Sequence, residues 1–362
     1  MKLRIIAFFA ATTLFAALGI TVQTFAQKSE NQIITFDINS FFTAARGINS
    51  AGEITGVYAK FFSTSDGFLR APDGTITLFD CPGALIGTSP TAINSAGEIT
   101  GNCSDSAGTH GFLRARDGNI ATFDAPGSPI ALGAGGTSPS SINAAGKITG
   151  SYINVRLDAV QHGFVRDSDG TIMSFDCPGA PGGTSPSSIN AAGEITGNCS
   201  DAAGTHGFLR ARDGNITTFD ASDAGGPGST SPQSINTMGE ITGSYTNAKD
   251  NHGFLRAPDG TITLFDCSGA VLGTFPTAIN SAGEITGNCS GAGAHGFLRD
   301  RDGTITTFDA PGALIGTFPT AINSAGEITG FFFIDPESFP RSFLRYADHH
   351  AESENELDEE IP

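Results

Sequence analysis

A repeat of about 45 residues runs through almost the whole of this 362-residue chain. A typical copy carries Ile-Asn-x-x-Gly-x-Ile-Thr-Gly, then His-Gly-Phe-Leu-Arg, and then Asp-Gly-x-Ile-x-x-Phe-Asp. The asparagines of the first motif recur every 43 to 49 residues, at Asn49, Asn94, Asn143, Asn190, Asn236, Asn280 and Asn323. Self-similarity at this period predicts that each copy is one supersecondary unit, stable only when it packs against its neighbours.

One copy, Thr88–Gly127, predicts four antiparallel strands and no helix. Its β-branched and aromatic residues form short runs separated by turn residues, and no run has the length or the periodicity of a helix. The Asp117-Gly118 dipeptide is a strong hairpin signal. The expected strands span residues 90–94, 98–103, 110–114 and 119–124. Four strands in about 45 residues match the size of one β-propeller blade.

The two ends of the repeat predict a closed ring. The chain opens with only the last piece of a copy, Ile33–Asp37, and its final copy stops after Ser342–Arg345. Together these fragments make one complete copy. We therefore expect an all-β fold, a seven-bladed β-propeller over residues 27–346 with four antiparallel strands per blade. The strand Gln32–Ile38 is expected to close the ring as the outer strand of the last blade, which leaves no unpaired terminal blade.

The motifs also predict contacts within each copy. The register set by the Asp-Gly turn places Phe112 opposite Phe123, as an aromatic pair that packs between blades. Glu98 lies on a strand antiparallel to that of Arg114, which predicts an ion pair repeated around the ring. The mid-strand Gly101 has a counterpart in every copy, which indicates close approach by the phenylalanine or by a neighbouring blade.

The N-terminal segment has the features of a signal peptide. Two basic residues precede an apolar run, Ile5–Val22, and small residues follow at Thr24 and Ala26. We expect cleavage after Ala26, so that residues 1–26 are removed and the mature chain has no membrane span. The alternative is an uncleaved anchor, because the run is about long enough to cross a bilayer. Either outcome predicts an exported protein that is secreted, periplasmic or held at the cell surface.

The charge balance is acidic, with 37 acidic and 19 basic residues and a net charge of −18. Residues 347–362 concentrate acidic side chains and contain no Lys or Arg, which predicts a disordered tail. Phosphate binding needs a basic stripe, and the sequence has none, so a nucleic-acid partner is not expected. The mature protein is expected to be a monomer.

The six cysteines form three pairs, each separated by 22 residues. The pairs are Cys81–Cys103, Cys177–Cys199 and Cys267–Cys289. Copies with Ala in place of the first cysteine have Tyr or Phe in place of the second, so the two positions change together. This pattern predicts three disulfides in an oxidising compartment, each stabilising the fold by on the order of 3 kcal/mol. Zinc ligation, the alternative, lacks the usual ligand spacing, so no metal is expected.

Five histidines share one repeat position at the start of the third strand, where the Asp of Phe-Asp ends the adjacent fourth strand. The candidate ligand-binding residues are His110, His162, His206, His252, His295, Asp124, Asp176, Asp220, Asp266 and Asp309. These pairs could line a ligand face, or each could be a structural hydrogen bond that orders a loop. Five identical copies favour the structural interpretation. The histidines lie roughly 10 Å outside the innermost strands, so they diverge and suit a shared metal poorly.

The Ile-Asn-x-x-Gly-x-Ile-x-Gly motif followed by His-Gly-Phe-Leu-Arg resembles the bacterial extracellular repeats of the HAF type, named for a His-Ala-Phe step. Here Gly replaces the Ala. The resemblance covers residues 32–346 and implies an exported, propeller-like protein. It implies no particular activity.

No copy carries an unrepeated acid pair, nucleophile elbow or Ser/His/Asp group, so the sequence names no catalytic residue and no cofactor. We expect a non-enzymatic binding or structural module for an unknown protein or glycan ligand. The alternative is a glycan-acting hydrolase or lyase with its site on the loop face or in a central channel. Such a site should break the repeat locally, and the longest insertions are Ser128–Gly136 and Ile153–Gln161.

Overall fold

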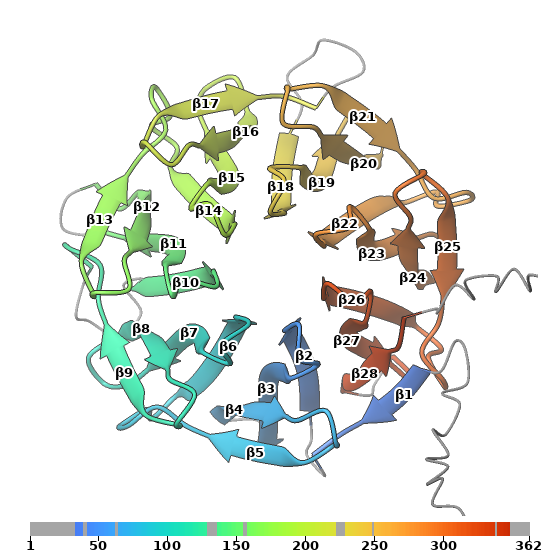
Figure 1. The fold of residues 1–362 in the computed structure, drawn as a ribbon, viewed down its shortest axis with the longest axis horizontal. Coiled ribbons are helices and arrows are strands. Elements are labelled where there is room, and N and C mark those ends of the chain that lie inside the picture. Colours follow the sequence, from blue (N-terminus) through green and yellow to red (C-terminus); the bar gives the residue numbers. More distant parts are fainter. Residues whose placement is uncertain are drawn as a thin grey trace, which may run out of the picture.

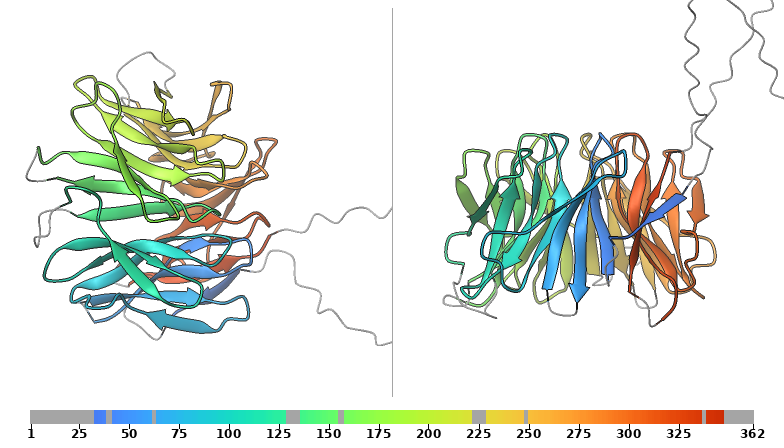
Figure 2. Two further views of the ribbon diagram at one scale, coloured as in Figure 1. Left: turned by 60° about the vertical axis from the view of Figure 1, so that its left-hand side comes forward. Right: turned by 90° about the horizontal axis from the view of Figure 1, so that it is seen from below.

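Every regular element of the structure is a β-strand. The structure, a computed structural model, describes residues 33–38, 42–61, 64–128, 136–154, 158–221, 229–247, 250–336 and 339–347. These residues form 28 strands and no helix, which confirms the all-β class. The strands stand around a ring in axial view (Figure 1), and the ring is a short cylinder in side view (Figure 2). Residues 1–26 and 348–362 lie outside the described residues, so the signal peptide and the acidic tail stay predictions.

Antiparallel pairing joins the strands in groups of four. In each group the first strand lies nearest the ring axis and the fourth lies on the rim (Figure 1). The groups are β2 (Phe42–Ile48), β3 (Ile54–Phe61), β4 (Thr64–Arg70), β5 (Ile76–Phe79); β6 (Gly87–Ile93), β7 (Ile99–Ser104), β8 (Thr109–Arg114), β9 (Ile120–Phe123); β10 (Thr137–Ile142), β11 (Ile148–Ile153), β12 (Gln161–Arg166), β13 (Ile172–Phe175); β14 (Thr184–Ile189), β15 (Ile195–Ser200), β16 (Thr205–Arg210), β17 (Ile216–Phe219); β18 (Ser229–Ile235), β19 (Ile241–Thr246), β20 (Asn251–Arg256), β21 (Ile262–Phe265); β22 (Gly273–Ile279), β23 (Ile285–Ser290), β24 (Ala294–Arg299), β25 (Ile305–Phe308); and β26 (Gly316–Ile322), β27 (Ile328–Phe333), β28 (Arg341–Arg345) with β1 (Ile33–Phe36).

The sheets extend beyond these groups. Three sheets contain eight strands and one contains four, rather than one separate sheet for each copy of the repeat. A single parallel residue pair makes each extension, as between Ser65 of β4 and Gly87 of β6. The cause is local: the start of a third strand lies beside the start of the next group's first strand.

Strand β1 pairs with β28, although the two lie at opposite ends of the sequence. The pairing is antiparallel, with Ile33 opposite Arg345 and Phe36 opposite Ser342. This is the pairing predicted for Gln32–Ile38, of which Gln32 is outside the described residues. The segment from the N-terminal side therefore supplies the fourth strand beside β26, β27 and β28.

Each repeat asparagine builds a turn and contacts the next group, as Asn94 illustrates. Its Oδ1 accepts hydrogen bonds from the backbone N–H groups of Ala96 (3.0 Å) and Glu98 (2.9 Å). Its Nδ2 donates to Glu98 Oε2 (2.7 Å) and to the carbonyl of Asn143 in the next group (3.0 Å). Two donors and two acceptor sites are the full capacity of an amide side chain, so a side chain without an amide cannot make the same four contacts.

The hydrogen bonds between asparagines form a closed circle. Each Nδ2 donates to the carbonyl of the next repeat asparagine at 3.0 to 3.1 Å. The last of them, Asn323, donates to the carbonyl of Asn49 at 3.1 Å. All seven asparagines are buried, which makes an unsatisfied amide there costly.

Aromatic and arginine side chains hold adjacent groups together. Phe79 of β5 packs edge-on against Phe112 of β8, with ring centroids 6.3 Å apart. The guanidinium carbon of Arg114 lies 4.9 Å from the centre of the same Phe79 ring. The arrangement recurs around the ring, with Phe–Phe distances of 6.0 to 6.4 Å. Each phenylalanine on the rim is thus held by a ring and a cation of the next group.

The prediction that Phe112 pairs with Phe123 is wrong. Phe112 lies opposite Thr122, and Gly111 lies opposite Phe123. The loop 115–119 closes the hairpin one residue out of the assumed register, and a shift of one residue moves a side chain to the other face of the strand. Phe112 therefore packs between groups, as expected, but its partner belongs to the preceding group.

The prediction of a Glu98–Arg114 ion pair is also wrong. Glu98 accepts from the repeat asparagine, while Arg114 lies over Phe79. Lys147, which takes the place of this glutamate in one copy, forms an ion pair with Asp167 at 2.6 Å. The position of Glu98 and Arg114 on adjacent antiparallel strands did not determine their partners, because both side chains interact with residues outside that pair of strands.

The interpretation of Gly101 is confirmed. A Cβ atom at this position would lie 2.9 Å from a ring carbon of Phe112 and would meet the backbone of β6 more closely still. The mid-strand glycine therefore makes room for the buried phenylalanine and the innermost strand.

We predict that Asn94→Asp destabilises the protein more than Asn143→Asp. Both variants lose the buried donor to the next asparagine, at a cost of about 1–3 kcal/mol. Only Asn94→Asp also places a carboxylate against Glu98, because Lys147 stands at the corresponding position beside Asn143. Urea unfolding measures the difference. Asn119→Thr, at an exposed turn, is the control, and equal losses in the two aspartate variants would contradict the prediction.

Candidate functional site

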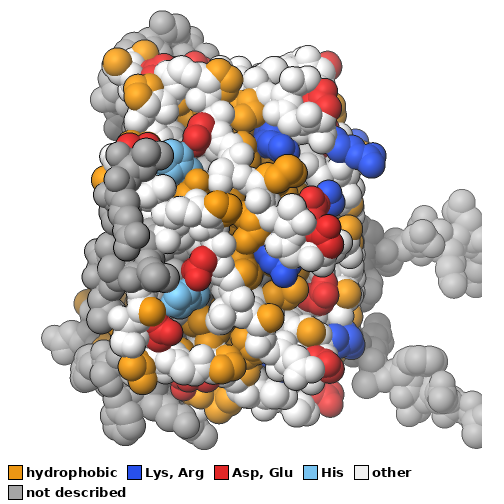
Figure 3. All heavy atoms as spheres, turned by 90° about the vertical axis from the view of Figure 1, so that its left-hand side faces the viewer, with side chains coloured by type: hydrophobic (Ala, Val, Ile, Leu, Met, Phe, Trp, Pro, Cys, Tyr) orange, Lys and Arg blue, Asp and Glu red, His pale blue; other side chains and the backbone are white. Residues whose placement is uncertain are grey.

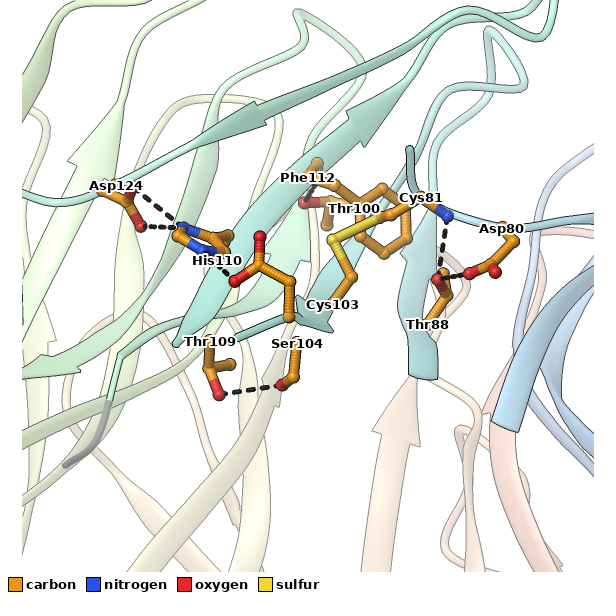
Figure 4. The surroundings of a disulfide bond; sticks show 11 residues. Asp80, Cys81, Thr88, Thr100, Cys103, Ser104, Thr109, His110, Phe112 and Asp124 are labelled. Atoms are coloured by element: carbon orange, nitrogen blue, oxygen red, sulfur yellow. Dashed lines mark hydrogen bonds and ion pairs between the residues drawn. A yellow bond between two sulfur atoms is a disulfide. The ribbon is translucent and has the colours of Figure 1, made fainter. Parts of the chain in front are cut away.

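Each histidine of the repeat bonds to its predicted aspartate. His110 Nδ1 lies 2.9 and 3.0 Å from the two carboxylate oxygens of Asp124 (Figure 4). The same contact measures 2.9 to 3.1 Å for the other four pairs, His162–Asp176, His206–Asp220, His252–Asp266 and His295–Asp309. Strand geometry brings each pair together, because the third strand starts where the fourth ends. Figure 3 shows imidazoles beside acidic side chains near one edge of the ring, whereas Lys and Arg lie nearer the other edge.

Three of the histidines also meet a second carboxylate. His110 Nε2 lies 3.3 Å from Asp105, and the corresponding partners of His162 and His206 are Asp158 and Asp201, both at 3.2 Å. Asp105 is itself fixed by the backbone N–H groups of its loop. Since a carboxylate only accepts hydrogen bonds, both ring nitrogens must carry protons to satisfy both contacts. These three sites therefore favour imidazolium.

The pKa values agree with this geometry. Burial alone would lower the pKa of His110, but hydrogen bonds and charge from Asp124 and Asp105 outweigh it, so the pKa is raised. The pKa of His162 is raised by the same balance. For His206 the hydrogen bond that the ring donates to Asp220 is the largest influence, and it also raises the pKa.

The remaining histidines have different outer partners. His252 Nε2 faces the amide nitrogen of Asn247 at 2.8 Å, a contact that a neutral ring can accept. His295 has the most exposed side chain of the five, at 52%. The five sites share the inner carboxylate and differ in the group beyond the ring.

Two groups lack a histidine at this position. In one, Arg341 takes its place, with Nε 3.9 Å from Asp37, the counterpart of Asp124. In the other, Asp66 takes its place, opposite Tyr58. Burial, followed by the charge and hydrogen bond of Asp66 and the charge of Asp80, raises the pKa of Tyr58 to about 12. Residue spacing did not indicate this acidic group, because Asp80 is the regular aspartate of the Phe-Asp motif and only Asp66 departs from the repeat.

The His–Asp pairs do not converge on one centre. Among the described residues, no three His, Cys, Asp or Glu side chains are arranged to hold a metal ion. Four of the five histidines instead bridge a loop residue to the end of a rim strand, as His110 bridges Asp105 and Asp124. This arrangement fixes loops, and it presents half-exposed carboxylates at the ring edge.

The three cysteine pairs form the predicted disulfides. The Cα atoms are 6.3 Å apart in Cys81–Cys103 and Cys177–Cys199, and 5.9 Å apart in Cys267–Cys289. In other groups an aromatic residue fills the same place. The Tyr152 ring lies 5.3 Å from His162, and its group has the buried Ala125 in place of the first cysteine. A small residue with a large ring therefore replaces the volume of a disulfide.

The segments that connect a fourth strand to the next first strand lie at the same edge as the histidines. We call this edge the link face. Three of its connections expose neighbouring aliphatic side chains, Leu85 and Ile86, Val271 and Leu272, and Leu314 and Ile315. Val271 lines a pocket of about 330 Å³ together with His252, Asp266 and Asp250.

The longest insertions are only partly described. Residues 129–135 of Ser128–Gly136 and 155–157 of Ile153–Gln161 lie outside the described residues. A different departure from the repeat lies on the innermost strands, where Arg46 is the one charged residue. Alignment of the copies would have found it, since Thr, Ser or Gln occupies the same place elsewhere.

Comparison with solved structures establishes the β-propeller fold. Virginiamycin B lyase from Staphylococcus aureus, crystallised with quinupristin, has a TM-score of 0.59 at 16% identity, covering 88% of this chain and 100% of that one. The β-propeller domain of the Trilobed protease from Pyrococcus furiosus has a TM-score of 0.57 at 8% identity, covering 84% and 94%. Oligogalacturonate lyase in complex with manganese has a TM-score of 0.57 at 10% identity, covering 88% and 97%. Identities this low show the fold alone.

Neither a protein-family model nor a curated protein matches the sequence. In the part of the chain that the structure describes, no helix could cross a membrane. Three disulfides fit an oxidising environment.

We predict that Asp105→Asn lowers the pKa of His110. The variant removes one of the two carboxylates that favour the charged ring. In the native protein, the raised pKa of His110 stabilises the fold fully below about pH 6.5, its unfolded value, and this stabilisation is lost as the pH rises through the folded value. The Asp105→Asn variant should lose part of this stabilisation. An NMR titration of the His110 ring measures the pKa; Asp117→Asn is the control, and an unchanged pKa would refute the assignment.

We also predict that Cys177→Ala with Cys199→Tyr is more stable than Cys177→Ala with Cys199→Ala. Both lose a disulfide that contributes on the order of 3 kcal/mol. Only the tyrosine restores the volume, as the Ala125 and Tyr152 pair does. Urea unfolding under reducing and non-reducing conditions compares them with the native chain. A tyrosine variant no more stable than the double-alanine variant would show that the aromatic residue does not replace the disulfide.

Proposed function

We propose that this protein is an exported, seven-bladed β-propeller that binds a partner protein on its link face and has no catalytic role. The observation that carries the proposal is the set of exposed aliphatic pairs at Leu85–Ile86, Val271–Leu272 and Leu314–Ile315. Neighbouring exposed apolar side chains beside polar groups are typical of protein interaction sites.

Several contacts support a ring of seven blades. The antiparallel groups of four strands, the β1–β28 pairing and the circle of asparagine hydrogen bonds all agree with closure. In such a ring the connections that carry Val271–Leu272 and Leu314–Ile315 are neighbours, since they lead into β22 and β26. The connection that carries Leu85–Ile86 leads into β6 and is separated from them by the connection between β1 and β2. The three pairs therefore fall within four consecutive connections of the link face.

Export is supported by the signal-peptide pattern of residues 1–26 and by the three disulfides. The resemblance to HAF-type repeats points the same way. The His–Asp pairs give this surface its polar, carboxylate-bearing border, and they keep its loops in place.

An enzyme that cleaves a glycan is the second candidate. The observation that favours it is the acidic group of Asp66, Asp80 and Tyr58, which replaces a His–Asp pair in one blade. Two of the three similar structures named above are lyases, and one of these acts on oligogalacturonate by its name. The two candidates therefore place function in different residues of the same face.

A binding screen of the mature chain against secreted proteins and glycans separates the candidates. We expect a protein partner whose affinity falls at least about tenfold in Leu314→Ser with Ile315→Ser, since buried apolar anchors dominate interfaces. Met173→Ser, exposed on the rim strand β13, is the matched control and should bind normally. Cleavage of any glycan in the panel that Asp66→Asn abolishes would reject the binding module in favour of the enzyme.

A further inference from the structure

Arg46 interrupts a ring of hydroxyl groups on the innermost strands. Its counterparts at the same bulge of the first strand are Thr91, Ser140, Ser187, Gln233, Thr277 and Thr320. The five hydroxyls donate hydrogen bonds of 2.8 to 3.1 Å to a backbone carbonyl of the next group. The arginine cannot repeat this contact with the geometry of a hydroxyl, so the first group gives up one bond that holds neighbouring groups together.

The Arg46 side chain is solvent-exposed and turns to an aromatic cluster across the junction with β26–β28. Its guanidinium carbon lies 5.8 Å from the centre of the Phe331 ring. Phe318 stacks on Phe331 with centroids 5.4 Å apart, and Phe333 meets both rings edge-on. The three phenylalanines are only half-buried, so the cluster borders solvent as well as protein.

The aromatic residues are a second departure from the repeat at the same place. The position of Phe318 is Ser in β6, β10, β14 and β18, and the position of Phe331 is Asn or Ser in β7, β11, β15, β19 and β23. Phe275 of β22 continues the apolar stretch into the neighbouring group. The inner edge of the ring is thus aromatic on one side and lined by small polar side chains on the other.

Within the described part of the chain, no acidic side chain balances the charge of Arg46. Among the described residues, no acidic side chain forms an ion pair with it, and the surrounding protein lowers its pKa by desolvation alone. The chain as a whole carries a net charge of −18. An uncompensated guanidinium at a solvent-accessible edge of such an acidic protein is suited to an anion supplied from outside.

We propose that Arg46 and the Phe318–Phe331–Phe333 cluster bind an organic carboxylate that carries an aromatic group. The guanidinium holds the carboxylate through paired hydrogen bonds, and the ligand's ring packs on the half-buried phenylalanines. A free small acid and the C-terminus of a peptide that ends in an aromatic residue share this chemistry. The site lies on the inner edge of the ring, so the proposal is independent of partner binding on the link face.

Fluorine NMR of the mature chain tests the site with 4-fluorophenylacetate as the probe. We expect saturable binding of this acid and none of 2-(4-fluorophenyl)ethylamine, which carries the opposite charge on a similar ring. The peptide Ser-Gly-(4-fluoro-Phe) with a free C-terminus is compared with its amide. Preference for the free peptide identifies a peptide terminus as a competent ligand, whereas equal, weak binding of both peptides restricts the site to small acids.

Arg46→Thr is the decisive variant, because it restores the residue found at this position in other copies. We expect the acid to bind at least about tenfold more weakly, while thermal stability is kept or increased through a regained hydroxyl bond to the next group. Phe331→Asn, which copies Asn102 and Asn288, should also weaken binding. Arg116→Gln is the matched control, since Arg116 is an exposed arginine that pairs with Glu53 and is not part of the cluster.

Three outcomes would overturn the proposal. One is equal binding of the acid by the native chain and Arg46→Thr. Another is binding of the amine as tightly as the acid. The third is the absence of binding by any probe; a loss of stability in Arg46→Thr would then make Arg46 a packing residue of the β2–β27 junction.

Discussion

The buried side-chain amide of the repeat asparagine is the interaction on which the structure depends. One residue closes the turn after the first strand, holds the adjacent glutamate and bonds to the next group of strands. Because Asn323 donates to Asn49, local turn chemistry and long-range closure are satisfied by the same atoms. A change in this residue therefore affects two adjacent groups at once, and the recurrence of the motif follows from that coupling.

The strands, the turns and the cysteine pairing could be predicted because each is encoded within one copy of the repeat. Partners across copies were harder to predict. Phe112 and Arg114 both lie against Phe79 of the preceding group, and neither partner follows from the spacing within their own hairpin. A register error of one residue was enough to assign Phe112 to Phe123, because adjacent strand residues face opposite sides.

The same division holds for the candidate site. The contact between His110 and Asp124 could be predicted, because it joins the two ends of a single hairpin. The second carboxylate, Asp105, comes from a loop whose fold depends on its own backbone hydrogen bonds. The cluster around Arg46 needs residues from both ends of the sequence, so it became visible only when β2 was placed beside β26 and β27.

A ring of near-identical groups can tolerate such departures because each group contacts mainly its neighbours, so the cost of a substitution stays local. Replacing one hydroxyl by Arg46 removes one of several hydrogen bonds across a junction, a loss of about 0.5–1.5 kcal/mol. The hydrogen bond from Asn49 to Asn94 and the Phe79–Phe112 contact still hold that junction together. Structural and functional roles therefore fall on different residues. Positions shared by all copies close the ring, and positions that differ in one copy are available to bind a ligand.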